Sequence, residues 1–385
     1  MLLVARVLPL VNRGAMLKAV ALSLSVAFIF VVLWLIGVDL FLSLVSRLHP
    51  AWVALFAALY TLSFALRAAR WKVIAEAASG GSVGFSKLVT INFSGWFVNE
   101  VTPAKVGDIL RISLLASQGG VSFGESTSTI AVERAFDVLS IALVSSALLF
   151  AAGFSSYIPF HIKLIALVIF AILALILILT LAFCVAGPRI INVLRLHMIS
   201  VRLHNLTYGL AVGMRDGVQK LSRKPKALAI TALLSPPIWV SDALSIYIFI
   251  NAVGIPELSQ TLLLAVLAGV YPGVWLTDAA TLNLYLSPFS SVSVGVCMMA
   301  ALLGFASKFF PVVPGGFGFY ELIVAMTISI TGLPLNIGLA VALLDHVARL
   351  AYCSATGLPS LVHNGIGVGF ILSGHVHKAS KNHLK

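Results

Sequence analysis

Val101–Gly107 (VTPAKVG) interrupts an apolar segment in the first half of the chain, and Val312–Gly318 (VVPGGFG) interrupts one in the second half. Both stretches fit the pattern V-x-P-x-x-[V/F]-G, in which proline breaks a helix and glycine permits a tight turn. Interrupted helices at corresponding positions of two halves are typical of a substrate site in a membrane transporter. The pattern therefore predicts two pseudo-repeated halves, each with a Pro/Gly-broken re-entrant hairpin.

The composition of the 385 residues requires a large surface in contact with lipid. Hydrophobic residues make up 60% of the chain and charged residues only 10%, whereas about a quarter of the residues of a soluble protein are charged. A single soluble core also stops growing at roughly 250–300 residues. We therefore expect an all-α polytopic membrane protein, and we exclude a soluble enzyme, a disordered chain and a secreted disulfide scaffold.

Several apolar segments are long enough to cross a bilayer, which takes about 20 residues. They lie at roughly 17–38, 50–66, 130–153, 162–184, 227–250 and 335–362. The first follows basic residues as a signal sequence would, but its length and the lack of a small-x-small cleavage site predict a retained helix. The segments 85–117, 259–285 and 290–332 are too short, too polar or too interrupted for simple spans. Irregular backbone within a membrane needs shelter by protein or water, so we expect a site in these segments.

Positive charge predicts the orientation in the membrane. The chain has 25 Lys and Arg against 13 Asp and Glu, a net charge of +12. The basic residues concentrated in 189–226 predict a cytoplasmic amphipathic linker that lies on anionic lipid. Basic residues near both ends and in 67–87 place those segments on the same side. We expect a multi-pass protein of the cell (plasma or inner) membrane with cytoplasmic N- and C-termini, and no nucleic-acid partner.

A single transmembrane domain is expected over residues 1–385. Its first half covers about 15–186, the basic linker about 187–226, the second half about 227–363 and a C-terminal tail 364–385. The loops 38–50, 153–161 and 251–258 are short and nearly uncharged, as expected for the outer side of the membrane.

The first break carries candidate ligands for an anion. A helix that begins near Gly107 presents free N–H groups and the positive end of its dipole. Lys105 adds charge, and Arg111 suits bidentate contact with a phosphate. The candidate substrate-binding residues here are Asn99, Pro103, Lys105, Gly107, Asp108 and Arg111. The alternative is an ordinary basic loop at the cytoplasmic surface.

A polar group formed by Glu133, Arg134 and Asp137 enters the apolar run 138–150 and is also a candidate for substrate binding. Glu133 and Asp137 share one helix face and repel each other unless a cation or a proton intervenes, and Arg134 supplies part of that compensation. Two interpretations stay open and are not exclusive. One is a structural ion network, and the other is a polar lining for a lipid head group.

The second break carries glycines and one acid in an apolar segment. Its candidate binding residues are Pro314, Gly315, Gly316, Gly318 and Glu321, because glycine lets backbone N–H groups turn toward an anion. An isolated intramembrane acid marks function by default, so Glu321 is a candidate proton-coupling group. The alternative is a tight hairpin that needs glycine only for packing. Asp345 and Arg349, spaced i,i+4, are interpreted as an intrahelical ion pair.

The sequence contains no motif for catalysis. G-x-S-x-G, HExxH, a P-loop and a dinucleotide-binding glycine motif are all absent. The three cysteines, Cys184, Cys297 and Cys353, lie in apolar runs without metal-site spacing. We therefore expect no catalytic residues, no cofactor and no metal site.

Three blocks of the chain resemble the lysylphosphatidylglycerol synthase transmembrane, or flippase-like, superfamily. The blocks are Asn99…Pro103-x-Lys105-x-Gly107-Asp108…Arg111, Glu133-Arg134-x-x-Asp137 and Pro314-Gly315-Gly316-x-Gly318-x-x-Glu321. The resemblance implies two re-entrant hairpins and a lipid-sized cavity, in a family linked to moving lipids between leaflets and to glycolipid, hopanoid or polyprenyl-lipid handling. Family members often have an arginine where this chain has Asp345 and His346. After residue 362 only a tail of about twenty residues follows, so lysyl-lipid synthesis by this chain alone is not expected.

From these features we expect a lipid flippase or transporter for a phosphate-bearing membrane lipid, a polyprenyl lipid or a glycolipid. Two alternatives come from other classes: a membrane enzyme that acts on a lipid phosphate, and a non-catalytic partner of a glycolipid or cell-envelope synthesis complex. The expected partner is an anionic membrane lipid. A glycosyltransferase or another lipid-synthesis protein is a candidate protein partner, and the sequence is compatible with an oligomer.

Overall fold

The structure is a computed structural model. It describes residues 30, 33–34, 36–102, 105–151, 168, 171, 174–175, 178–179, 182–183, 186–193, 201–254, 293–309, 314–331 and 333–366. Within this part of the chain every regular element is helical, as the composition predicts. The elements are α3 (Val38–Ser46), α4 (Pro50–Ser79), α5 (Phe85–Val101), α6 (Val106–Gln118), α7 (Phe123–Ala151), α9 (Val201–Ser222), α10 (Pro225–Ala252), α13 (Val294–Ser307), η4 (Pro314–Gly316), α14 (Phe319–Ile328), η5 (Ser329–Thr331) and α15 (Leu335–His363).

Three of these helices, α4, α10 and α15, are long and apolar enough to cross a membrane. They confirm the helices predicted at 227–250 and 335–362, and they extend the one predicted at 50–66 to Ser79. The segment predicted at 130–153 belongs to α7, which begins earlier, at Phe123. The predicted spans 17–38 and 162–184 fall mostly, and the interrupted segment 259–285 entirely, outside the described residues.

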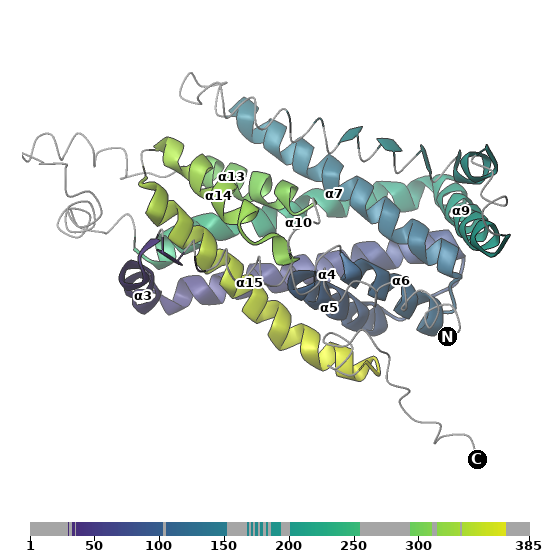
Figure 1. The fold of residues 1–385 in the computed structure, drawn as a ribbon, viewed down its shortest axis with the longest axis horizontal. Helices are drawn as coiled ribbons and strands as arrows, with labels where there is room; N and C mark the ends of the chain where they lie inside the picture. Colours follow the sequence, from purple (N-terminus) through teal and green to yellow (C-terminus); the bar gives the residue numbers. More distant parts are fainter. Residues whose placement is uncertain are drawn as a thin grey trace, which may run out of the picture.

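The core lies between α4 and α10, which pack along each other, and extends to α13, α14 and α15. Aromatic rings dominate the contact: Phe56 stacks on Tyr60 with centroids 5.4 Å apart and meets Phe249 at 5.1 Å. Local signals fix the ends of α4, because Pro50 suits the first helical position and Gly80 closes the helix at φ 78°. Figure 1 shows α4, α7, α10 and α15 running along the bundle, with the short pairs α5–α6 and α13–α14 toward opposite ends.

The first break joins α5 and α6 into a closely packed antiparallel pair. Lys105 immediately before α6 has φ 55°, the one non-glycine residue with positive φ in the described part of the chain. Two glycines allow the close approach, because a Cβ on Gly107 would lie 1.9 Å from the carbonyl oxygen of Gly95. Pro103 itself lies outside the described residues.

The second break joins α13 and α14 through η4. Gly315, Gly316 and Gly318 all have positive φ (62°, 80° and 96°), which explains why this turn needs glycine. A Cβ on Gly304 of α13 would lie 2.7 Å from the Tyr320 ring of α14, so these helices also pack closely. Each break thus connects two short helices and precedes a long one, α7 or α15. A repeat symmetry and re-entry into the membrane stay predictions.

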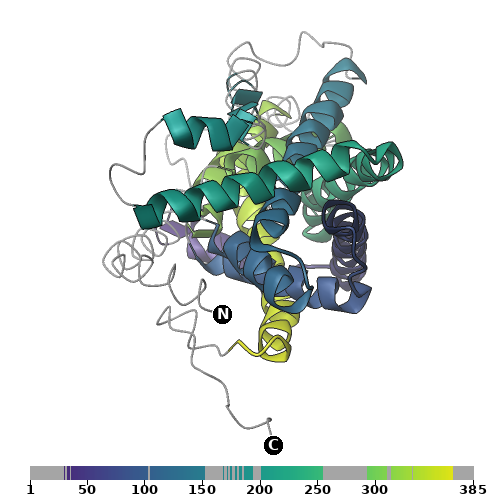
Figure 2. The ribbon, with the colours of Figure 1, turned by 90° about the vertical axis from the view of Figure 1, so that its right-hand side faces the viewer.

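The basic linker contains α9, which lies across the end of the bundle (Figure 2). It packs mainly on α7 and α4, and Gly213 allows the approach because its Cβ would lie 2.7 Å from the Cα of Gly124. Lys220 forms an ion pair with Glu125 at the start of α7. The basic linker as a cytoplasmic, lipid-bound segment stays a prediction.

Arg67 and Arg70 belong to the segment 67–87 whose basic residues were used to predict orientation, but both lie inside the bundle. Both residues lie within α4, which continues to Ser79, and both side chains are buried. Charge within an apolar bundle is tolerated when it is paired, and here acids on α7 and α10 pair with these arginines. These two charges therefore belong to the interior and carry no information on orientation.

Candidate functional site

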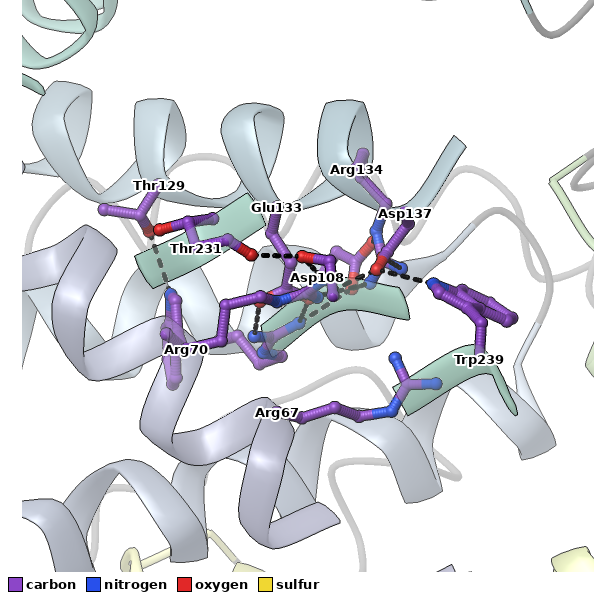
Figure 3. A network of polar contacts seen from close by, with 12 residues as sticks. Arg67, Arg70, Asp108, Thr129, Glu133, Arg134, Asp137, Thr231 and Trp239 are labelled. Carbon is purple, nitrogen blue, oxygen red and sulfur yellow. Dashed lines mark hydrogen bonds and ion pairs between the residues drawn. The ribbon is translucent and has the colours of Figure 1, made fainter. Parts of the chain in front are cut away.

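Four arginines and four carboxylates from α4, α6, α7 and α10 form a polar network inside the bundle, in which Trp239 links the pair of Arg67 and Asp242 to Asp137. Figure 3 labels Arg67, Arg70, Asp108, Glu133, Arg134 and Asp137 among them. The network comprises Arg67, Arg70, Asp108, Arg111, Glu133, Arg134, Asp137 and Asp242, and we call it the arginine cluster. Its formal charges cancel. Buried charge is costly unless it is paired and hydrogen-bonded, so this balance is what allows eight ionised groups to share an apolar interior.

At the centre of the arginine cluster, Arg111 and Glu133 form a bidentate pair with N–O distances of 2.8 and 2.7 Å. Arg111 is fully buried, and its guanidinium also lies 4.3 Å from the centroid of the Trp71 ring. Gly95 of α5 makes room for it, since a Cβ there would lie 2.2 Å from Cγ of Arg111. The sequence predicted Arg111 as a phosphate ligand, and the structure places both of its terminal nitrogens on Glu133 instead.

Asp137 is held by three helices. Arg70 of α4 contacts it at 2.8 Å, Arg134 of its own helix at 3.0 Å, and the indole N–H of Trp239 on α10 donates to Oδ1 at 3.1 Å. Arg70 also donates to Ser235 at 2.9 Å. The residues predicted from the Glu133–Asp137 block therefore do form an ion network, which is one of the two open interpretations.

Arg67 and Asp242 form the part of the arginine cluster that the sequence prediction missed. They pair at 2.6 Å, and the Arg67 guanidinium lies 4.4 Å from the Trp96 ring centroid and 5.0 Å from that of Trp239. The available signal was a charge within each of two apolar helices, Arg67 after the run 50–66 and Asp242 within the run 227–250.

One edge of the arginine cluster is partly exposed. Arg134 retains 22% of its side-chain exposure and Asp108 14%, and the two are joined by contacts of 3.0 and 3.2 Å. Asn99 donates to Oδ1 of Asp108 at 3.0 Å. Lys105, half-buried, lies within electrostatic range of Asp108 and Arg134. The structure thus brings three candidates of the first break, Asn99, Lys105 and Asp108, close to Arg134 of the Glu133–Asp137 block.

A second polar cluster gathers Glu100, Lys308, Glu321 and His346, and we call it the histidine cluster. Nδ1 of His346 lies 2.5 Å from Glu321, and its Nε2 lies 3.2 Å from Nζ of Lys308 and 3.5 Å from Oε2 of Glu100. Glu321 also accepts the backbone N–H of Gly318 at 2.7 Å. His346 is buried and stacks on Phe317 with centroids 3.9 Å apart.

Asp345 and Arg349 connect the histidine cluster to the rest of the bundle. They form the predicted i,i+4 pair at 3.0 Å, and Tyr320 donates a short hydrogen bond to Asp345. Arg349 further donates to Ser245 at 2.6 Å and to the carbonyl oxygen of Asp242 at 2.8 Å. Asp242 therefore links Arg67 of the arginine cluster, through its carboxylate, to Arg349, through its carbonyl oxygen.

The two breaks meet at Glu100, which lies at the end of α5. A Cβ on Gly315 would lie 2.8 Å from the Glu100 carbonyl oxygen, and Lys308 lies 3.6 Å from its carboxylate. The sequence predicted sites at both breaks, and the structure places them side by side. Gly316 and Gly318 belong to the same turn. Glu100 and His346 were not among the candidates, and nothing in the spacing of either residue distinguished it.

The fold and these clusters define an integral membrane protein with a buried ion network. The model of the lysylphosphatidylglycerol synthase TM region matches residues 18–272, about two-thirds of the chain. The chain belongs to this family, as the resemblance implied, and the match includes the first two of the three sequence blocks. The match covers Asn99 to Asp137 and ends before the second break.

Similar proteins come from archaea. The chain is 23% identical to the UPF0104 membrane protein PH1989 of Pyrococcus horikoshii over 86% of this chain and 92% of the relative. It is 23% identical to the glycosyltransferase AglD of Haloferax volcanii over 83% of this chain and 50% of that protein. The UPF0104 membrane protein MJ1595 of Methanocaldococcus jannaschii is 29% identical over 31% of this chain and 36% of its own. No solved structure matches the chain significantly.

Proposed function

We propose that this protein moves a phosphate-bearing lipid between the leaflets of its membrane. The observation that carries the proposal is a partly exposed rim of three cations where the two breaks meet: Lys105, Arg134 and Lys308. Arg134 contacts Asp108 at 3.0 Å, Lys308 lies 3.6 Å from Glu100, and Lys105 is within electrostatic range of both carboxylates. A phosphate that reaches this rim finds cations presented from both halves of the chain.

Charge balance indicates which cation is free for a ligand. The arginine cluster is neutral by itself, so its buried arginines are already compensated by acids. Lys105 is different, because no ion pair or hydrogen bond joins its side chain to another described residue. Arg134 and Lys308 are paired, but they retain 22% and 12% of their side-chain exposure. In this proposal Lys105 is the first phosphate ligand, and Arg134 and Lys308 complete the site.

In this proposal the arginine cluster holds the residues of the rim in place. Arg111 holds Glu133 and stands beside Asp108, at 3.7 Å, so it fixes the acid against which Arg134 rests. The acyl or isoprenoid chains stay in lipid while the head group crosses at the rim. This lowers the barrier, because a charge at the bilayer centre costs about 2.5–3.5 kcal/mol on insertion scales.

The relatives narrow the substrate class. One of them is named a glycosyltransferase, an enzyme that transfers a sugar, which favours a lipid whose phosphate carries or receives sugar. The same relative favours a second candidate function. It is about twice as long as its match to this chain, so a membrane domain of this family accompanies additional sequence there, and this chain would act as the non-catalytic partner of a separate glycosyltransferase.

Translocation in proteoliposomes tests the proposal. Purified protein is placed in phosphatidylcholine vesicles with a trace of NBD-labelled phosphatidylglycerol or NBD-labelled polyprenyl monophosphate, and dithionite reports the label that reaches the outer leaflet. With the protein present, we expect dithionite to bleach the label of the inner leaflet faster than in protein-free vesicles. For Lys105→Gln we expect the translocation rate to fall by about tenfold. NBD-labelled phosphatidylcholine tests selectivity for the anionic head group.

Lys226→Gln is the matched control, because Lys226 is an exposed lysine outside both clusters. It should translocate as the unchanged protein does. Equal rates with and without protein would refute a flippase and favour the partner of a glycosyltransferase. A chemically altered lipid, detected by mass spectrometry, would identify an enzyme that acts on the lipid phosphate instead.

A further inference from the structure

The histidine cluster contains the described groups best suited to exchange a proton near neutral pH inside the bundle. The arginine cluster pairs guanidinium groups with carboxylates, and neither titrates between pH 5 and 8 in an ordinary ion pair. Histidine is the side chain whose charge changes in that range. His346 is buried against Glu321 on one ring nitrogen and against Lys308 and Glu100 on the other.

We propose that the histidine cluster is a proton-binding site that couples proton movement to lipid movement. This inference rests on the proposed function. It adds a driving force for the transport, because the lipid phosphate and one proton are carried across the membrane together. His346 has two protonation states, and each of them finds partners among the residues that surround the ring.

In the neutral state, Nδ1–H of His346 donates to Glu321, and the bare Nε2 accepts from the ammonium group of Lys308 at 3.2 Å. This arrangement uses one of the three donors of Lys308 on the histidine. The lysine is thereby turned toward the interior of the bundle. It is the same lysine that borders the rim, at 3.6 Å from Glu100.

In the protonated state, Nε2–H becomes a donor and can no longer accept from Lys308. A new acceptor is already in place, because Oε2 of Glu100 lies 3.5 Å from Nε2 and has no hydrogen-bond partner among the described residues, although it is buried. Oε2 has an ion-pair contact with Lys308 at 3.6 Å, but a buried acceptor without a hydrogen bond costs free energy that a donor would recover. The proton therefore joins His346 to Glu100 and releases Lys308 toward the rim.

The formal charge of the histidine cluster favours the same exchange. Glu100 and Glu321 carry two negative charges, and Lys308 carries one positive charge, so the cluster is neutral only when His346 holds a proton. The pair of Asp345 and Arg349 beside it adds no net charge. A buried net charge is costly, so the cluster gains stability from one proton.

Other titratable and charged groups surround the site. They are Lys105 at the first break, Tyr60 of α4, Asp242 of α10, Tyr320 of α14, and Asp345, Arg349 and Cys353 of α15. Of these, Lys105 adds positive charge at the rim, while Arg349 is held by Asp345 and Ser245. None of them separates His346 from Glu100, Lys308 or Glu321.

Lipid phosphate and proton then favour each other. The proton frees Lys308 for the phosphate, and a bound phosphate draws Lys308 away from His346 and so favours the imidazolium. Such coupling is reciprocal by thermodynamic necessity. With one linked proton, affinity for the anionic lipid rises toward low pH by at most about tenfold per pH unit.

Vesicles of phosphatidylcholine with NBD-phosphatidylglycerol and trapped pyranine, a pH indicator, test the inference. We expect lipid exchange without a pH gradient, accumulation of the probe in the leaflet facing the more alkaline side when a gradient is imposed, and movement of protons that requires the probe. For His346→Gln we expect an exchange rate that no longer varies between pH 5.5 and 8, and no probe-dependent proton movement. His363→Gln, an exposed histidine on the same helix, is the matched control and should keep both properties.

The outcomes separate the two proposals. Lipid exchange at every pH without proton movement would refute proton coupling but would still support the proposed lipid translocation. Absence of exchange under all conditions overturns both. If His346→Gln does not yield a folded protein, the same measurements on the unchanged protein test the inference. A lipid exchange rate that depends on neither pH nor a pH gradient would contradict a proton-binding site.

Discussion

Glu100 and Gly315 are in direct contact, although they belong to different halves of the chain. The carbonyl oxygen of Glu100 would lie 2.8 Å from a Cβ on Gly315, so the turn after α13 fits against the end of α5 only because it has no side chain there. The contact joins the two breaks and places Lys308 beside the Glu100 carboxylate at 3.6 Å. Both polar clusters reach the rim at this junction.

Replacing Gly315 by alanine should destabilise the junction. The residue has φ 62°, which costs a residue with a Cβ roughly 1–2 kcal/mol, and the collision with Glu100 adds to that cost. We expect a lower midpoint of thermal unfolding in detergent. Gly120→Ala is the control, because Gly120 has φ 69° but no atom near its Cβ position. Equal losses for the two variants would show that the contact with Glu100 contributes nothing.

The pair of Arg67 and Asp242 should behave as a buried ion pair. Arg67→Met or Asp242→Leu alone leaves one charge without its 2.6 Å partner and should cost about 3–5 kcal/mol, whereas the double variant should recover most of the loss. The control is the pair of Lys72 and Glu76, whose side chains are 37% and 34% exposed, with changes within about 0.5 kcal/mol. Thermal unfolding of each variant gives the coupling energy. Strictly additive losses would contradict a paired interaction.

The close contact of α9 with α7 depends on Gly213. Alanine there places a Cβ 2.7 Å from the Cα of Gly124, so α9 should separate from the bundle and trypsin should cleave faster after the exposed Arg223. Gly209→Ala on the same helix meets no atom within 4 Å and should not accelerate cleavage. Unchanged cleavage of the Gly213 variant would mean that α9 does not need this contact.

Arg134 should require its guanidinium and not only its charge. Arg134→Lys keeps the charge but gives up the two contacts with Asp108 together with the one to Asp137, and Lys and Arg are not interchangeable where several carboxylates are bridged. We expect lipid translocation to fall by about tenfold or more, equivalent to about 1.4 kcal/mol in the barrier. Arg215→Lys on the surface of α9 is the control. Full translocation activity of Arg134→Lys would show that the guanidinium of Arg134 is not needed to bind the lipid phosphate.

The sequence was sufficient to predict the helical class, several long helices and the two breaks. Proline and glycine act locally, so their effect on Val101–Gly107 and Val312–Gly318 is readable from neighbouring residues. The burial of Arg67 and Arg70 was not predicted, because a basic residue at the end of an apolar run has the same local pattern whether it faces water or a buried acid. Their partners, Asp242 and Asp137, are remote in sequence.

The candidate site was predictable in part for the same reason. Asn99, Asp108 and Arg134 lie close to each other as expected, but the burial of Arg111 against Glu133 depends on how α6 packs on α7. The role of His346 as the neighbour of Glu100 and Glu321 depends on three elements that meet only in the folded chain. Such contacts need the tertiary structure.

A structure in lipid nanodiscs that contain an anionic, phosphate-bearing lipid tests the central claim most directly. We expect density for a phosphate at the rim, about 3 Å from Lys105 and in hydrogen-bond range of Arg134 or Lys308. Density in that position should disappear in Lys105→Gln and persist in Lys226→Gln. An empty rim, with ordered phosphate found only along α9 or elsewhere on the outer surface, would contradict the account.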